Sequence, residues 1–130
     1  MTIAALALAA CAAGPKADVS SAQMVVELTD YKVASNVATL KSGKAKIGVR
    51  NISGQLHEVI LIKTDTAADK LPVDGGTSKA KEDVKVASAM NIGAGGVVAM
   101  DVDLAPGNYL LICNVAGHYQ LGMRSAFKVE

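Results

Sequence analysis

The chain has 130 residues, a length that suits one domain with a hydrophobic core of its own. Hydrophobic residues make up 51% of the sequence, which excludes a disordered protein, and with three Tyr, one Phe and no Trp the core must be largely aliphatic. The formal net charge of +1 argues against a nucleic-acid-binding protein, because such proteins usually carry a strongly basic patch.

The first ten residues are uncharged, consist mostly of Ala and Leu, and are too few to span a bilayer. They lead into Leu8-Ala9-Ala10-Cys11, which resembles the lipobox of bacterial lipoprotein precursors. The resemblance implies a signal peptide over residues 1–10, a lipid on Cys11, a tether over residues 11–20 and a domain over residues 21–130. The alternative is a non-lipidated secretory signal cut at an Ala-x-Ala site, and in either case the domain is exported. A disulfide between Cys11 and Cys113 is a less favoured interpretation.

Seven segments have the β-branched, apolar or alternating pattern of short strands: residues 24–28, 31–40, 44–51, 56–63, 97–104, 109–113 and 124–129. Residues 44–51 alternate cleanly, with Ala45, Ile47 and Val49 on one face. Residues 56–63 are nearly all apolar and predict a strand buried on both faces. About seven short strands separated by turn signals predict an all-β sandwich or flattened barrel.

The polar segment from residue 64 to residue 91 breaks this pattern. It contains Pro72, Gly75 and Gly76, so we expect a long excursion from the sheets, with a helical turn at residues 79–84. An ordinary solvated insertion is the favoured interpretation, and a loop that contacts a partner is the alternative.

Three side chains of one predicted loop suggest a metal site. Cys113, His118 and Met123 offer a thiolate, an imidazole and a thioether, a ligand set that suits copper cycling between Cu(I) and Cu(II). His57 is the only other histidine of the chain and sits on a predicted buried strand. If the faces that carry His57 and Cys113 both point inward, the two side chains meet at one end of the sandwich.

With these residues the chain resembles the cupredoxins, the small type 1 blue copper proteins. The matching stretches are Asn51-Ile52-Ser53-Gly54 before His57, then Pro106-Gly107-Asn108-Tyr109, Cys113, Gly117-His118 and Gly122-Met123. The Cys-x4-His-x4-Met spacing is similar to that of rusticyanins, auracyanins and sulfocyanins, more than to that of plastocyanins. The resemblance implies a Greek-key sandwich of seven or eight strands, with His57, Cys113 and His118 as equatorial ligands of one copper ion and Met123 as the long axial ligand.

Glu58 departs from the family pattern. Plastocyanins and azurins carry an asparagine directly after the first histidine ligand, and that side chain ties the two ligand loops together. An ionised carboxylate only accepts hydrogen bonds, whereas an amide also donates them. We therefore expect the usual bond between the ligand loops to be missing or reversed.

Other interpretations of the site residues are weaker. Zinc is the rival metal, but a thioether as fourth ligand suits copper better. A thiol nucleophile at Cys113 with one histidine is a remote alternative, and the second copper cluster of a multicopper oxidase needs more than two histidines. Each residue alone fits an inert role, since buried cysteines and core histidines are common. We expect Met24, Met90 and Met100 in the core.

The resemblance implies one-electron transfer without substrate chemistry, and hence no enzyme. Electrons would pass through the exposed edge of His118, ringed by an apolar docking patch of Leu56, Ala116, Tyr119 and Leu121. The expected protein is a monomer held at the outer face of the cell membrane or in the periplasm by a lipid on Cys11, and it serves membrane-associated redox proteins. The alternative function is copper handling on the same fold, as a chaperone, scavenger or resistance protein.

Overall fold

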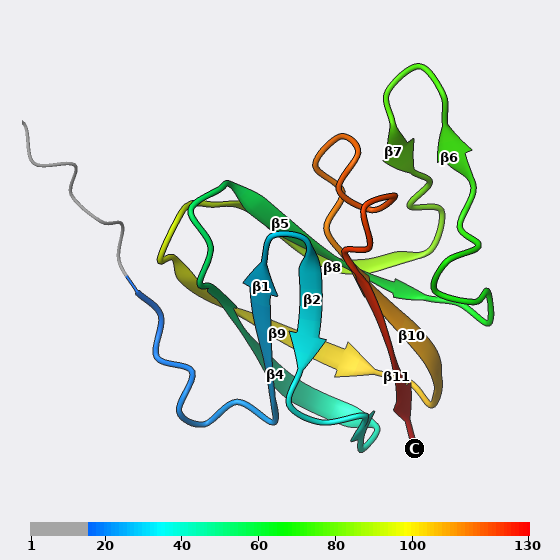
Figure 1. Ribbon diagram of the computed structural model, residues 1–130. Helices are drawn as coiled ribbons and strands as arrows, with labels where there is room; N and C mark the ends of the chain where they lie inside the picture. The colour runs from blue at the N-terminus through cyan, green and yellow to red at the C-terminus, as the bar shows by residue number, and fades with distance from the viewer. Residues whose placement is uncertain (1–15) are drawn as a thin grey trace, which may run out of the picture.

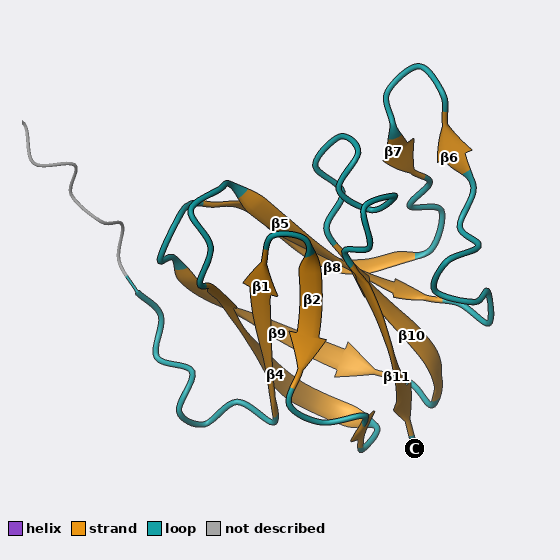
Figure 2. Cartoon of the chain, viewed as in Figure 1, coloured by secondary structure: helices purple, strands orange, loops and turns teal. Residues whose placement is uncertain are grey.

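A computed structural model of the chain describes residues 16–130. These residues form eleven strands and no α-helix, so none of them belongs to a helix that would cross a membrane (Figure 2). Three of the strands have only two residues. The remaining eight agree with the seven or eight strands implied by the resemblance, and the all-β prediction is confirmed.

The strands form two larger sheets and a separate hairpin (Figure 1). The first sheet has, in order, β2 (Lys32–Ser35), β1 (Met24–Thr29), β4 (Gly43–Asn51) and β9 (Val97–Leu104). The second has, in order, β3 (Thr39–Leu40), β11 (Arg124–Val129), β10 (Gly107–Ile112), β5 (His57–Lys63) and β8 (Lys85–Ile92). The hairpin pairs β6 (Val73–Asp74) with β7 (Lys79–Ala80).

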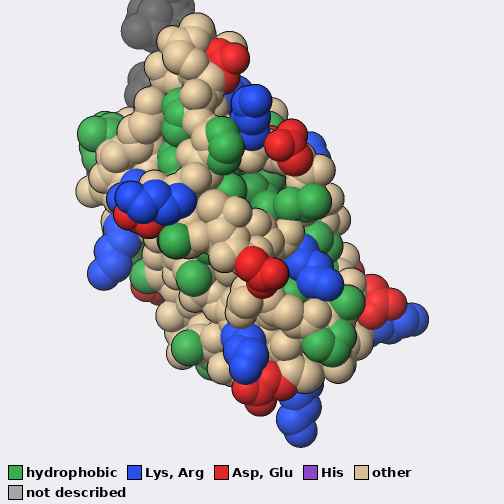
Figure 3. Space-filling model, turned by 90° about the vertical axis from the view of Figure 1, so that its right-hand side faces the viewer, with side chains coloured by type: hydrophobic (Ala, Val, Ile, Leu, Met, Phe, Trp, Pro, Cys, Tyr) green, Lys and Arg blue, Asp and Glu red, His purple; other side chains and the backbone are tan. Residues whose placement is uncertain are grey.

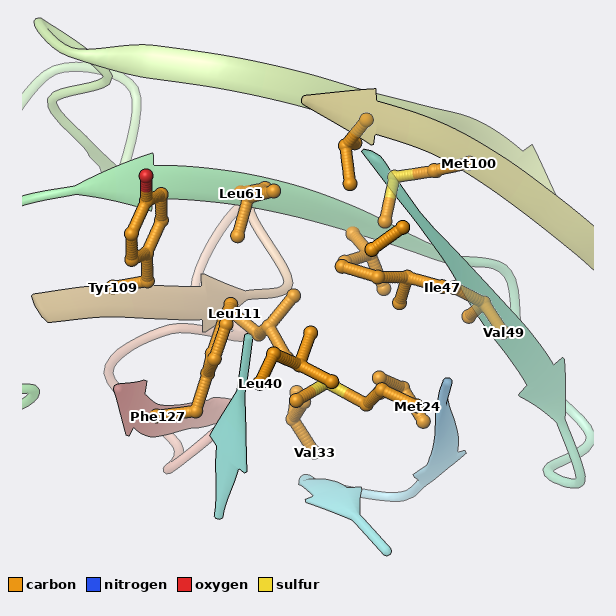
Figure 4. Packing of buried hydrophobic residues seen from close by; sticks show 14 of the residues in the cluster. Met24, Val33, Leu40, Ile47, Val49, Leu61, Met100, Tyr109, Leu111 and Phe127 are labelled. Atoms are coloured by element: carbon orange, nitrogen blue, oxygen red, sulfur yellow. The ribbon is translucent and has the colours of Figure 1, made fainter. Parts of the chain in front are cut away.

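The core lies between the two larger sheets (Figure 4). Ala45, Ile47 and Val49 of β4 are buried there, as their alternation predicts. The aromatic contribution is the stacked pair Tyr109 and Phe127, whose ring centroids are 5.3 Å apart. Met24 and Met100 are core residues as predicted, but Met90 is 51% exposed because it lies on the outer side of β8.

The outer face of the second sheet is also covered, as predicted from the apolar sequence of β5. The second, smaller cluster contains Ile60, Ile62, Leu110, Ile112, Tyr119 and Ala80. Leu71 and Val73, from the segment between β5 and β8, pack against it. This segment, residues 64–84, is therefore a cover for the sheet and not the solvated insertion that its polar composition predicts.

Three details differ from the sequence-based expectations. Residues 85–92 are not part of the excursion but form β8, whose inward side chains include the small Ala87 and Ala89, a weak hydrophobic signal. No helix forms at residues 79–84: residues 79–80 are the extended strand β7, and a single turn follows in which the N–H of Lys85 donates to the carbonyl of Glu82. Residues 31–40 are not one strand, since the chain crosses there from the first sheet to the second.

Packing begins a few residues before position 21, where the sequence analysis places the start of the domain. The N–H of Ala17 donates to the carbonyl of Val97 on β9. Val19 is buried and lies over Gly48 of β4. A side chain at position 48 would occupy the space that Val19 fills. Residues 16–20 are therefore partly integrated into the sandwich, while Cys11 and the predicted signal peptide lie outside the described residues.

The close approach of Val19 to Gly48 predicts that Gly48→Ala destabilises the protein. A Cβ atom at position 48 would lie 2.6 Å from Cβ of Val19, so the residues around Val19 must move. We expect a loss of about 1–3 kcal/mol in the free energy of unfolding, typical of overpacking. Urea unfolding of the metal-free protein measures it, with Gly54→Ala as the control, because nothing lies within 4 Å of a Cβ at position 54. Equal unfolding midpoints for the two variants would contradict this packing.

Candidate metal centre

The predicted ligands come from one end of the second sheet. His57 is the first residue of β5, and Cys113 directly follows β10, the strand paired with β5. His118 and Met123 lie in the ligand loop, residues 113–123, which connects β10 to β11. The register pairs Ile60 with Ile112, so His57 and Cys113 are brought to the same end and, by alternation, to the same inner face.

Three donor atoms converge there. The Sγ atom of Cys113 lies 3.6 Å from Nδ1 of His57 and 3.6 Å from Nδ1 of His118. The two Nδ1 atoms are 3.2 Å apart. All three residues are buried, and they form a group whose donor atoms all lie within 4.8 Å of one another. The fold thus brings a histidine from mid-chain to a cysteine and a histidine near the carboxyl end.

Met123 is held beside this group by its backbone. Its N–H donates to the carbonyl of His118, and its carbonyl accepts from the N–H of Cys113. The side chain is fully buried. Gly122 precedes it with a φ of 116°, a left-handed conformation that favours glycine and lets the loop turn back toward β11.

The geometry of the donors fits a single metal ion. Nitrogen and sulfur ligands bind a metal such as zinc at about 2.0–2.3 Å, so two donors on one ion lie about 3–4 Å apart. The three separations between Sγ and the two Nδ1 atoms fall in this range. Two imidazole nitrogens facing each other at 3.2 Å also require a proton or a cation between them, since two lone pairs repel.

Burial favours the neutral forms of the protein ligands. It raises the pKa of the Cys113 thiol, an effect that the backbone N–H groups of Glu58 and Val115 partly offset by donating toward the sulfur. It also lowers the pKa of His118, and the neighbouring His57 lowers that pKa further. A buried thiolate is stabilised by a cation, so a metal ion would supply the charge that this apolar site lacks.

Two polar residues that the sequence analysis did not assign to the site position His57. Asp30, in the turn between β1 and β2, has its Oδ1 atom 2.9 Å from Nε2 of His57. The buried side chain of Asn51 donates to the carbonyls of Gln55, Ile92 and Gly93 and so ties the loop before His57 to the loop after β8. The sequence indicates Asn51 only as part of the motif before His57, and no sequence pattern singles out Asp30.

As expected, no side-chain hydrogen bond at position 58 joins the two ligand loops, and Asn114 instead ties the ligand loop to residues 64–84. The buried side chain of Glu58 makes no hydrogen bond in the described structure, and burial raises the pKa of its carboxyl. Asn114, directly after Cys113, instead accepts from the N–H of Ala80 at 2.8 Å and donates to its carbonyl at 2.9 Å. It also donates to the carboxylate of Glu82 at 2.8 Å.

Further contacts join the ligand loop to the covering segment, residues 64–84. The N–H of Gly117 donates to the carbonyl of Ser78. The hydroxyl of Tyr119, directly after His118, donates to the carbonyl of Ala68 and accepts from the N–H of Leu71. In Figure 1 the β6–β7 hairpin lies beside the loop between β10 and β11. The covering segment therefore braces the residues that follow two of the predicted ligands.

The predicted docking patch needs one correction. Leu56, Ala116 and Leu121 are exposed, Leu121 by 60%. Tyr119 is only 3% exposed, because the covering segment binds its hydroxyl, so it does not belong to the patch. Tyr31, which the sequence did not indicate as part of the patch, borders His118. Its partly exposed ring packs edge-on against His118, with ring centroids 5.1 Å apart.

The side chain of His118 itself is 9% exposed. Its Nδ1 atom faces the other donors, and its Nε2 atom makes no hydrogen bond in the described structure. No buried side-chain nitrogen or oxygen in residues 16–130 lacks a hydrogen-bond partner. The Nε2 edge of His118 is therefore the part of the ring that reaches solvent.

The hydrogen bonds of Asn114 predict a measurable role in stability. Asn114→Ala leaves the N–H and the carbonyl of the buried Ala80 without partners, which we expect to cost about 1–3 kcal/mol of folding free energy. Hydrogen exchange at the Ala80 amide should accelerate. Asn108→Ala is the matched control, since it removes a single exposed bond to Asp65 and should change stability by about 0.5 kcal/mol or less. Equal exchange rates at Ala80 in both variants would contradict the brace.

Solved structures similar to this chain include auracyanins, a rusticyanin and an azurin. The auracyanin of Roseiflexus castenholzii has a TM-score of 0.59 and 21% identity, covering 84% of this chain and 98% of its own. Auracyanin A, a "blue" copper protein of Chloroflexus aurantiacus, has a TM-score of 0.55 and 23% identity, covering 82% and 98%. Rusticyanin of Thiobacillus ferrooxidans has a TM-score of 0.59 and 17% identity, covering 82% and 75%.

No protein-family model and no curated protein sequence matches this chain. The likeness is thus one of structure, over most of the described residues. An azurin from Methylomonas sp. strain J has the same fold at a TM-score of 0.55 and 17% identity, covering 82% of this chain and 95% of its own. The chain therefore has the cupredoxin fold, and at one end of its sandwich it holds a buried cluster of two histidines and a cysteine with Met123 beside it.

Proposed function

We propose that this protein is a mononuclear type 1 copper protein that carries single electrons between redox partners outside the cytoplasm. The observation that carries the proposal is the convergence of Sγ of Cys113 with Nδ1 of His57 and of His118 inside a rigid β-sandwich. A thiolate with two imidazoles and a weak thioether is the ligand set of electron-transfer copper sites. Structures with the same fold belong to blue copper proteins.

Copper, when bound, supplies a one-electron redox couple. His57, Cys113 and His118 would hold it in the proposed site, together with Met123. The protein's contribution is to keep these ligands in place, because Cu(I) and Cu(II) prefer different geometries. Asn51 fixes the loop before His57, and Asn114 and Tyr119 fix the ligand loop on both sides of His118. Ligands held this firmly favour fast electron transfer over rapid release of the metal.

The solvent-reaching Nε2 edge of His118 is the proposed route for electrons. Leu56, Ala116 and Leu121 are exposed, and with the ring of Tyr31 they form the revised docking patch. An apolar patch suits the small, short-lived interfaces of redox encounters. On the face drawn in Figure 3, basic and acidic side chains are interspersed. Together with a net charge of +1, this favours docking by apolar contact over long-range electrostatic steering.

The proposed setting is the periplasm or the outer face of the cell membrane. The lipobox-like sequence before Cys11 supports a lipid anchor on that residue. An anchored monomer would stay close to membrane-associated donors and acceptors, which raises their effective concentration without any contact between the proteins beyond the docking patch.

Loading the full chain with Cu(II) tests the copper assignment. We expect an intense blue colour and a paramagnetic resonance spectrum with a small copper hyperfine splitting. Both should be lost on mild reduction and recovered on oxidation, with the metal retained throughout. Cys113→Ser should abolish the colour while the fold is kept, since it removes the thiolate that gives rise to it. A colourless cupric protein would contradict the type 1 site. Rapid transfer of Cu(I) to a competing chelator would favour the copper-handling function instead.

The docking patch predicts a position-dependent effect of added charge. Leu121→Lys places a cation in the patch, and we expect the electron self-exchange rate between two copies to fall about tenfold, equivalent to roughly 1.4 kcal/mol of lost docking energy. Met90→Lys is the matched control, because it adds the same charge to an exposed apolar site on the outer side of β8. Magnetic resonance line broadening in mixtures of reduced and oxidised protein measures the rate. Equal slowing by both substitutions would contradict a route through this patch.

A further inference from the structure

The turn between β1 and β2 contacts both histidines of the metal centre. Asp30 lies in this turn, and its Oδ1 atom is 2.9 Å from Nε2 of His57. The His57 side chain is completely buried, whereas the Asp30 side chain is 34% exposed. Asp30 thus reaches from the surface to the far edge of a buried imidazole, on the side opposite the cluster of donor atoms.

The chemistry of this contact determines which nitrogen of His57 carries the proton. An ionised carboxylate only accepts hydrogen bonds, so the proton of the bond must sit on Nε2 of His57. In the neutral ring the Nδ1 atom then has a free lone pair. Nδ1 is the atom that lies 3.6 Å from Sγ of Cys113 and 3.2 Å from Nδ1 of His118. The tautomer favoured by Asp30 is therefore the one that presents a donor to the metal site.

The neighbouring residue restrains the second imidazole. The ring of Tyr31 packs edge-on against that of His118, and its hydroxyl accepts a hydrogen bond of 3.1 Å from Nε2 of Gln55. Gln55 lies in the loop that leads to His57, which is itself fixed by Asn51. The turn is thus connected to both halves of the site through side chains, although it contributes no metal ligand.

We propose that Asp30 is a positioning residue of the metal centre, which holds His57 in the Nε2–H tautomer and places a negative charge behind this ligand. Outer partners of this kind orient a ligating histidine and raise its basicity. The negative charge favours the more positively charged oxidised state of a bound redox metal. Asp30 therefore increases metal affinity and lowers the reduction potential. This inference rests on the metal-binding part of the proposed function and not on the electron-carrier role.

Two substitutions separate the hydrogen bond from the charge. Asp30→Asn removes the charge but leaves an oxygen that accepts from Nε2, whereas Asp30→Ala removes both. Asp101→Asn is the control for charge alone, because Asp101 is 81% exposed on the outer side of β9, where it pairs with Lys46. All variants are compared as the full chain.

The first measurement needs no metal. Nitrogen-15 resonances of the metal-free protein report the His57 tautomer, and we expect Nε2–H in the wild type, in Asp30→Asn and in Asp101→Asn. In Asp30→Ala we expect a mixture with the Nδ1–H form. A wild-type His57 protonated on Nδ1, or a tautomer unchanged in Asp30→Ala, would overturn the positioning role. If Asp30→Ala does not fold, Asp30→Asn still tests the proposal. In that variant His57 should keep the Nε2–H tautomer, while the midpoint potential of the copper-loaded protein should change.

The second measurement uses Co²⁺ as a probe, and the third uses copper. We expect Asp30→Ala to bind Co²⁺ about 10–100-fold more weakly, the usual effect of losing an outer partner, with partial rescue in Asp30→Asn. The midpoint potential of the copper-loaded protein should shift to more positive values in both Asp30 variants and stay constant in Asp101→Asn. Unchanged Co²⁺ affinity or an unshifted potential in the Asp30 variants would contradict the proposal. If the wild type proved to be colourless with copper, the tautomer and the Co²⁺ affinities would still decide the role of Asp30.

Discussion

The antiparallel pairing of β5 with β10 is the constraint on which the metal centre depends. Its register sets Ile60 opposite Ile112 and so brings His57 and Cys113 to the same end and the same face of one sheet. A slip by one residue would turn one of them to the opposite face. Both strands are buried on both faces, so such a slip is opposed by apolar packing on each side. The position of the first ligand therefore follows from the core and does not require a metal.

The other ligands lie on a loop, and a loop needs separate restraints. The covering segment, residues 64–84, provides them, since it packs on the outer face of the sheet and hydrogen-bonds to residues adjacent to the ligands. Asn114 follows Cys113 and Tyr119 follows His118, so each restraint acts one residue from a donor. In this chain Glu58, the residue after His57, makes no side-chain link between the two ligand loops, and Asn114 ties the ligand loop to the covering segment. Residues 64–84, whose polar sequence suggests a solvated insertion, thus restrain the ligand loop of the metal centre.

The polarity of the surroundings complements the charge of a metal ion. Burial raises the pKa of the Cys113 thiol and lowers that of His118, so without a cation the site favours an uncharged thiol and an uncharged imidazole. A cation reverses the preference of the thiol, because a buried anion is costly unless it is paired. Asp30 adds a negative charge on the outer side of His57. Metal binding is therefore coupled through electrostatics to the loss of the thiol proton.

Local pattern determined much of this protein. The alternation in β4 and the apolar run of β5 predicted buried faces that the structure confirms, because side chains on a strand alternate whatever the fold. The spacing of Cys113, His118 and Met123 placed three candidate ligands in one loop, since residues this close in sequence share their surroundings. Only the tertiary structure decided that Tyr31 and not Tyr119 borders His118 at the surface, and that Asp30 touches His57. Those contacts join residues far apart in the chain, and no periodic pattern encodes which hairpin turn reaches which ligand. They depend on how the two sheets pack.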